Sequence, residues 1–313
     1  MSKIGERIAY QINQLFPPLH IHRDLEKAKL DISENQAWSL AEARRVVKYF
    51  GPYWDLKGKH LLDIGTGIGG KLKLYEEWGV STITGIDIHP KSVTISRKFL
   101  RDQTTPGSSS LPAFFSVSDA ANMPFADNSF DAIVSINVFE HIIEVEKAIY
   151  ETFRVVKPDG VVFLHVPPYY GPWGPHLENW IHFPWPHLLF SDRTLLRVAE
   201  REDKKRPLND QFMYAAQVDW NADRIQGINR VSFREFDRMI RQAGFSINSL
   251  TLLPVGYEFL PNQKNVLAKL IFKVLQMCTR IPLIQEVIIT KMVYVLSKPK
   301  QQISQAAIDN TRI

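Results

Sequence analysis

The chain has 313 residues, of which 45% are apolar and 23% charged, a composition typical of a packed globular protein rather than a disordered one. Its net charge of +5 comes from lysines and arginines dispersed along the sequence, so we expect no nucleic-acid partner. Cys278 is the only cysteine, which excludes an intramolecular disulfide framework and a cysteine zinc cluster. No signal peptide is visible, and no apolar run reaches the roughly 18 residues of a membrane span. We therefore expect a cytoplasmic protein.

The first half of the chain alternates helical and strand patterns. In the helices apolar residues recur every three to four positions, whereas the strands are short apolar runs between turns. In chain order we predict a helix at 36–50, a strand at 59–64, a helix at 70–79, a strand at 81–88, a helix at 91–102, strands at 111–118 and 131–138, a helix at 144–156 and a strand at 161–166. This alternation predicts an α/β fold with a Rossmann-like, doubly wound sheet. Such sheets bind ligands beyond the carboxyl ends of their strands.

The second half breaks the alternation. Residues 167–228 are rich in proline, aromatic residues and histidine, and we interpret them as an insertion after strand five that forms a lid. Regular patterns then return as a helix at 232–245, a strand at 245–253, a helical segment near 262–280 and a last strand at 287–298. We accordingly divide the chain into a helical extension (1–35), a cofactor-binding core (36–166), the insertion (167–228), the C-terminal part of the core (229–298) and a tail (299–313).

Residues 61–70, LLDIGTGIGG, fit two nucleotide-binding patterns at once. Gly65, Gly67 and Gly70 fit G-x-G-x-x-G, the loop of dinucleotide enzymes, whereas Asp63 with Gly65, Gly67 and Gly69 fits D-x-G-x-G-x-G. A glycine turn before a helix N-terminus binds a pyrophosphate or a carboxylate equally well. Asp87, at the end of the second predicted strand, could bind a ribose in either case. Asp63 favours a cationic ammonium, because it would repel a pyrophosphate.

Several further motifs follow in a fixed order. DIGTGIGG, GIDI, SDAANMPF, FDAIVSINVFEHI and KPDG together resemble the class I S-adenosylmethionine-dependent methyltransferases, in particular their small-molecule type 11 group. The resemblance covers about residues 36–166 well and 230–298 loosely. It implies a seven-stranded sheet with an antiparallel last strand and S-adenosyl-L-methionine as cofactor.

The resemblance also implies a role for each cofactor-site residue. Asp63 and the loop of Gly65, Thr66, Gly67 and Gly69 would hold the methionine part. Asp87 would bind the ribose diol, with Ile88 against the adenine. Asp119 and Ala120 would read the adenine edge, and Asn137 would lie beside the sulfonium. Taken singly, the glycines could instead form a plain structural turn, and Asp87 and Asp119 could cap helices.

The insertion offers candidates for the acceptor site. We single out His165, Tyr169, His176 and His182 as base or orienting groups, in no fixed order. The alternative is a packed lid in which these side chains are structural. Asn137, Glu140 and His141 resemble the E-x-x-E-H metal cluster of ubiquinone O-methyltransferases, but an asparagine replaces the first carboxylate. We therefore predict no catalytic metal.

The predicted activity is methyl transfer to a small-molecule acceptor, with O-methylation of a hydroxyl on an aromatic, sugar or lipid-like metabolite as the first choice. A methyltransferase-like binding protein without turnover and a nicotinamide-dependent oxidoreductase are the alternatives. Residues 264–281 carry an apolar stripe beside Lys269 and Lys273. This segment could touch a membrane peripherally, although we expect it to dock on its own domain.

Overall fold

The computed structural model describes residues 3–17, 32–103, 111–205, 218–257, 266–282 and 284–300. Within these residues, one sheet contains β1 (His60–Ile64), β2 (Thr82–Asp87), β3 (Ala113–Val117), β4 (Phe130–Ile136), β5 (Val156–Val166), β6 (Ser246–Pro254) and β7 (Ile289–Ser297). The strand order is β3-β2-β1-β4-β5-β7-β6. The pairs among β1 to β5 are parallel, whereas β7 runs antiparallel to both β5 and β6. The predicted Rossmann-like sheet with an antiparallel last strand is confirmed.

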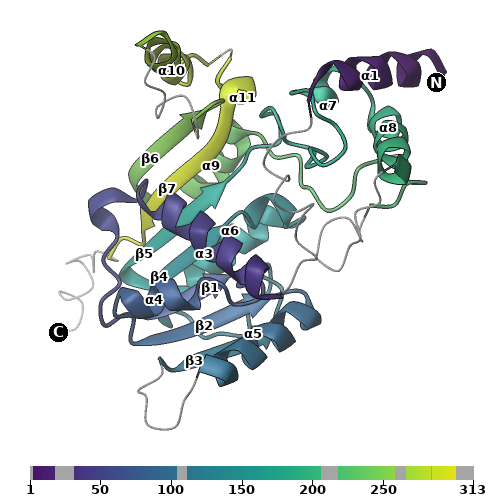
Figure 1. Ribbon diagram of the computed structural model, residues 1–313. Coiled ribbons are helices and arrows are strands. Elements are labelled where there is room, and N and C mark those ends of the chain that lie inside the picture. Colours follow the sequence, from purple (N-terminus) through teal and green to yellow (C-terminus); the bar gives the residue numbers. More distant parts are fainter. Residues whose placement is uncertain are drawn as a thin grey trace, which may run out of the picture.

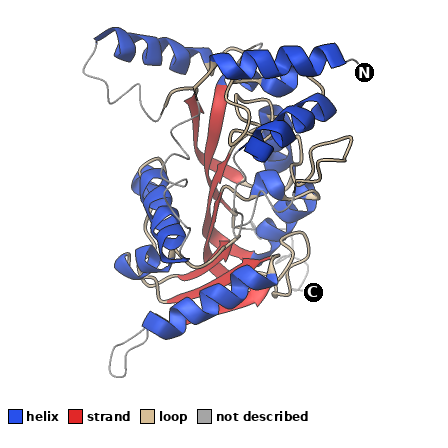
Figure 2. Ribbon diagram, turned by 45° about the vertical axis from the view of Figure 1, so that its right-hand side comes forward, coloured by secondary structure: helices blue, strands red, loops and turns tan. Residues whose placement is uncertain are grey.

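Helices cover both faces of this sheet (Figure 2). One core joins α6 (Val145–Val155) and α9 (Phe233–Gln242) to one face. The other core joins α3 (Ile32–Val47), α4 (Leu72–Glu77) and α5 (Pro90–Gln103) to the opposite face. The central strands are apolar on both faces because both faces are buried. The layers leave the carboxyl ends of β1, β4 and β5 together at one edge of the sheet.

The segment around the KPDG turn is more irregular than its sequence indicates. β5 begins at Val156, before the turn, and its pairing with β4 shifts register between Phe130 and Ala132. Asp159 has a φ of +59° inside this bulge. The regular part of β5, beginning at Val161, matches the predicted strand.

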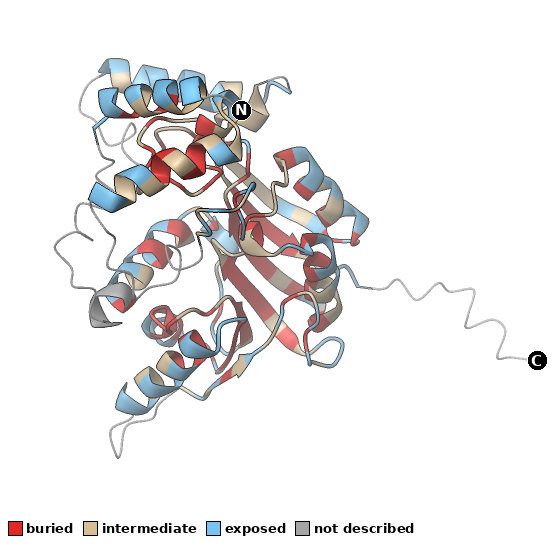
Figure 3. Cartoon of the chain, turned by 90° about the vertical axis from the view of Figure 1, so that its right-hand side faces the viewer, coloured by how far each residue is buried: buried red, intermediate tan, exposed pale blue. Residues whose placement is uncertain are grey.

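The insertion and the N-terminus share a core of their own, which we call the cap. It joins α1 (Lys3–Leu15) and α8 (Asp192–Lys205), and the short α7 (Pro186–Leu189) packs against α8. Trp180, Phe183 and Leu195 are buried there. In Figure 3, red segments of buried residues lie beside the N-terminal helix. Asn13 fastens α1, because its Nδ2 donates to the Trp180 carbonyl at 2.8 Å. Helix α8 was not anticipated, although Ser191 and Asp192 precede an apolar pattern at helical spacing.

The connection between β6 and β7 contains α10 (Val266–Cys278) and the short α11 (Gln285–Ile288). None of the residues of α10 is buried. The expectation that this segment docks its apolar stripe on the domain is therefore wrong, and most of that stripe faces outward. None of the helices in the described ranges is long and apolar enough to cross a membrane.

Candidate active site

The glycine-rich loop follows β1 at the carboxyl edge of the sheet. Gly65, Gly67 and Gly69 all have positive φ angles, of +71°, +58° and +84°. A Cβ on Gly65 would lie 2.2 Å from Cγ2 of Val138, so glycine is required there by space as well as by φ. The backbone N–H groups of Gly65 and Thr66 both donate to the Ile86 carbonyl, at 2.8 and 2.9 Å. The loop is therefore fastened to the end of β2.

Asp87 connects the loop to the end of β2. Its Oδ2 accepts from the Gly67 N–H and its Oδ1 from the His89 N–H, both at 2.9 Å. Ser96 of α5 donates to the Gly67 carbonyl at 2.7 Å, and Gln36 of α3 donates to the Ile68 carbonyl at 2.9 Å. A carboxylate has about four acceptor positions, so Asp87 keeps lone pairs for two ligand hydroxyls.

Asp63 is 1% exposed, and its carboxylate already has a cationic partner. Lys71 Nζ donates to Asp63 Oδ1 at 2.6 Å and to the Gly65 carbonyl at 3.3 Å. Burial raises the pKa of Asp63, and the ammonium of Lys71 opposes that rise. Lys71 did not emerge from the sequence, although a lysine directly after GIGG was a visible signal.

The region expected for the adenine is open. Ile88 is 60% exposed at the end of β2, an apolar surface that a stacked base would cover. Asp119 follows β3, and its Oδ1 accepts from the Ala121 N–H at 2.8 Å. Ala120, beside it, is buried. Together with Asp87, these donors, acceptors and apolar surfaces fit an adenosine group.

Asn137 lies at the end of β4 and connects three strands. Its φ is +54°, and its N–H donates to the His165 carbonyl at 2.8 Å. Its Oδ1 lies 3.0 Å from both His165 Nδ1 and Lys291 Nζ. Because a carbonyl oxygen only accepts, Nδ1 of His165 carries the proton and Nε2 has a free lone pair. Burial, followed by the charge of Lys291, holds the pKa of His165 well below its usual value.

Two carboxylates from separate elements join this group. Glu140 belongs to the 3-10 turn η3 (Phe139–His141), and neither of its buried carboxylate oxygens has a hydrogen-bond partner in the structure. The insertion supplies Glu178, whose Oε2 is also buried without one. Burial raises the pKa of both carboxyls, while His141 and Lys291 oppose the rise. The ring of His176 contacts that of His141 at 5.0 Å.

The predicted catalytic candidates are not brought together as one group. Burial holds the pKa of His176 well below its usual value, so this ring is neutral beside His141. Tyr169 is 7% exposed and lies in another cluster, where its ring is 4.9 Å from His187 and 5.2 Å from the Arg230 guanidinium. His182 lies in the cap, where its N–H donates to Asn13 Oδ1 at 2.6 Å.

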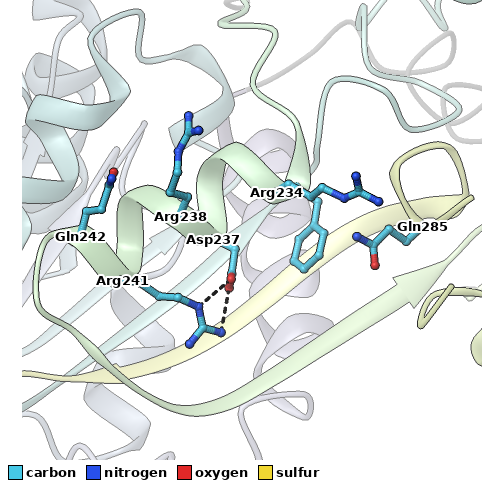
Figure 4. Close-up of a pocket in the computed structure, with 7 residues that line it drawn as sticks. Arg234, Asp237, Arg238, Arg241, Gln242 and Gln285 are labelled. Atoms are coloured by element: carbon cyan, nitrogen blue, oxygen red, sulfur yellow. Dashed lines mark hydrogen bonds and ion pairs between the residues drawn. The ribbon is translucent and has the colours of Figure 1, made fainter. Parts of the chain in front are cut away.

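Two other features concern the surroundings of the site: metal ligands and a surface hollow. In the part of the chain that the structure describes, no group of three His, Cys, Asp or Glu side chains could hold a metal ion. Figure 4 shows a surface hollow along α9, lined by Phe233, Arg234, Asp237, Arg238, Arg241, Gln242 and Gln285. Arg241 pairs there with Asp237 at 2.8 Å. None of these side chains belongs to the groups around Asp87 or Asn137.

Comparison with known proteins fits this geometry. The methyltransferase domain family matches residues 62–164. Phosphoethanolamine N-methyltransferase 2 of Caenorhabditis elegans is 32% identical over 124 residues, which are 39% of this chain and 26% of that protein. Norajmaline N-methyltransferase of Rauvolfia serpentina is 30% identical over 136 residues, 42% of this chain and 45% of that protein. The matched segments thus span less than half the length of these relatives.

A solved structure shows the same fold. Phosphoethanolamine N-methyltransferase 2 of Haemonchus contortus, in complex with S-adenosyl-L-methionine, has a TM-score of 0.50 and is 17% identical. The matched region covers 83% of this chain and 53% of the Haemonchus contortus chain. At this identity the likeness shows the fold. Residues 62–164 match the methyltransferase domain family, which favours S-adenosylmethionine over a nicotinamide as the cofactor.

Proposed function

We propose that the chain transfers a methyl group from S-adenosyl-L-methionine to a hydroxyl of a small aromatic, sugar or lipid-like acceptor. One observation carries the proposal. The loop fixed by Asp87 and the Asn137 group with its buried carboxylates lie at the same edge of one sheet. The first can hold a nucleoside, and the second offers polar groups to an acceptor beside it.

The cofactor would be held by the residues that surround the loop. Asp87 accepts from the ribose diol, Ile88 covers the adenine, and Asp119 and Ala120 read its edge. Asp63 and Lys71 face the amino-acid part, where the carboxylate suits an ammonium and the lysine suits a carboxylate. Asn137 lies beside the sulfonium.

S-adenosylmethionine supplies an activated methyl group, so the chain mainly has to align the acceptor and exclude water. A hydroxyl acceptor must also lose its proton. Because burial holds the pKa of His165 and His176 low, these rings are weak bases. Burial raises the pKa of Glu140 and Glu178, which makes them the stronger proton acceptors. His165 then acts by holding Asn137 in place.

Calorimetry with S-adenosylhomocysteine tests the cofactor site. We expect micromolar binding to the wild type and loss of about two orders of magnitude in Asp87→Ala, because two charge-assisted hydrogen bonds are removed. Asp223→Ala is the matched control, since this carboxylate pairs with Arg193 at the surface. Equal binding by wild type and Asp87→Ala, or a preference for NADH, would overturn the assignment.

The acceptor is tested by product analysis. The enzyme is incubated with isotopically labelled S-adenosylmethionine and pools of phenols, sugars and amines, and mass spectrometry locates the label. A methyl group on oxygen supports the proposal. A methyl group on nitrogen or carbon would replace the hydroxyl assignment and leave the cofactor site standing. Micromolar cofactor binding without turnover on any pool would favour a binding protein instead.

A further inference from the structure

Helix α10 turns its apolar side away from the protein. Val266, Leu270, Val274 and Met277 are between 51% and 79% exposed, and Ile271 and Ile281 are also exposed. The side that faces the domain is different. It consists of Ala268, Phe272 and Leu275, of which Phe272 packs on the core, and Thr279 just beyond the helix is buried. At 3.6 residues per turn, the centres of the two sides lie roughly 150° apart around the helix.

A third side of α10 is cationic. Lys269 and Lys273 are exposed one helical turn apart, and Arg280 is exposed in the turn that follows the helix. They lie along one border of the apolar side, between it and the domain. No aspartate or glutamate occurs between 266 and 282. An outward apolar face bordered by cations is the pattern of a helix that lies in the interface of an anionic membrane.

A second apolar surface lies at the same end of the molecule. Figure 1 shows α1 and α10 at the same end of the molecule, α10 at the upper left and α1 at the upper right of the view. On α1, Ile4 and Ile8 are 68% and 45% exposed, one helical turn apart, next to exposed Lys3 and Arg7. A flat surface could therefore contact both helices.

This end of the molecule is also the edge that carries the candidate site. β6 is antiparallel to β7, which is antiparallel to β5, so β6 runs parallel to the strands of the core. The connection that contains α10 leaves the carboxyl end of β6. The carboxyl ends of β1 and β4, with the loop and Asn137, lie at the same edge.

We propose that α10, together with α1, docks this chain on an anionic lipid surface, with the carboxyl edge of the sheet toward the bilayer. A second copy of the chain is a poorer occupant, because two α10 helices face to face would bring Lys269, Lys273 and Arg280 against like charges with no carboxylate in the segment to pair them. Docking here is independent of which atom the enzyme methylates.

Vesicle sedimentation of the full chain tests this proposal. We use vesicles of phosphatidylcholine alone and of equal parts of phosphatidylcholine and phosphatidylglycerol, at low and high salt. We expect binding to the anionic vesicles that weakens as salt is added. Replacing Lys269, Lys273 and Arg280 by glutamine should weaken it by about fivefold for each cation removed. Equal binding to both kinds of vesicle would overturn the anionic preference.

The apolar side has its own variant and control. Leu270→Asp should reduce binding at least tenfold, because it places a charge in the centre of the outward face. Phe114→Asp is the matched control. Phe114 is 64% exposed on β3, which is the outermost strand on the side of the sheet away from β6. Both variants should keep wild-type affinity for S-adenosylhomocysteine, which shows that they fold.

Two results would overturn the proposal. One is a folded wild type that stays in the supernatant with anionic vesicles. The other is Leu270→Asp converting a wild-type dimer to a monomer in solution while vesicle binding is unchanged, since the face would then belong to a second copy.

Discussion

The two halves of the carboxyl edge differ in how their polar groups are paired. On the cofactor side, Asp63 is paired with Lys71 and Asp87 accepts from two backbone N–H groups. On the acceptor side, oxygens of Glu140 and Glu178 and Nε2 of His165 are buried without a hydrogen-bond partner in the structure. In the proposed function, the cofactor therefore meets groups that the fold already pairs, whereas the acceptor meets groups that still lack a hydrogen-bond partner.

Removing one partner of the Asp63–Lys71 pair should have the largest effect on stability. Lys71→Met leaves a buried carboxylate uncompensated, and we expect the free energy of unfolding to fall by about 3–5 kcal/mol. Arg44→Met is the matched control, since that pair with Glu77 is half exposed and is worth at most about 1 kcal/mol. Urea unfolding measures both.

The pH dependence of the stability loss in Lys71→Met tests whether the buried carboxylate of Asp63 causes that loss. Burial raises the pKa of Asp63 in the folded state, so its ionisation opposes folding and the cost appears as the pH rises above the unfolded value. Lys71→Met should therefore approach wild-type stability at acid pH and diverge from it toward neutral pH. S-adenosylhomocysteine should stabilise Lys71→Met more than 5′-methylthioadenosine does, because only the first brings an ammonium to Asp63. A pH-independent loss would contradict the buried-charge explanation.

The glycine loop offers a pair of variants that separates backbone strain from close packing. In Gly65→Ala the alanine has to keep a positive φ, and its Cβ would also clash with Val138. The free energy of unfolding should therefore fall by about 2–5 kcal/mol. Gly67→Ala has the positive φ but open space around its Cβ, and should cost about 1–2 kcal/mol. Denaturant midpoints test the ranking. Equal losses in the two variants would show that contact with Val138 does not shape the loop.

A change in stability of opposite sign is expected at Glu140. Glu140→Gln removes a buried carboxylate whose raised pKa makes ionisation unfavourable to folding. The variant should be more stable than wild type by about 1–3 kcal/mol at pH 8 and no more stable at pH 4. If Glu140 accepts the acceptor's proton, kcat should fall by at least about 100-fold. A destabilised variant would show that Glu140 is already compensated.

The sequence predicts the geometry of the glycine loop better than that of the group around Asn137, for a physical reason. The loop and Asp87 lie within single strand–turn–helix units, where glycine spacing and strand ends determine local geometry. Lys71 lies within such a unit but was not predicted, because neither glycine pattern specifies the residue after the last glycine.

The acceptor side depends on contacts that local patterns do not encode. Lys291 of β7 contacts Asn137, and Glu178 of the insertion comes under the charges of Lys291 and His141, only in the folded chain. Lys291 interrupts the apolar pattern of β7, and this interruption was a local signal of its contact with Asn137. The predicted candidates Tyr169 and His182 instead lie in two separate clusters. Both belong to an aromatic-rich segment whose side chains pack mainly against one another.

The cap also bears on how the chain is synthesised. Asn13 finds its partner Trp180 across 167 residues of sequence. At 5–20 residues per second, α1 leaves the ribosome roughly 10 to 30 s before that partner exists. During this interval the apolar side of α1 has nowhere to pack. Nascent chains should therefore attract a chaperone at α1, and appending the first 17 residues behind residue 300 should shorten that period of exposure.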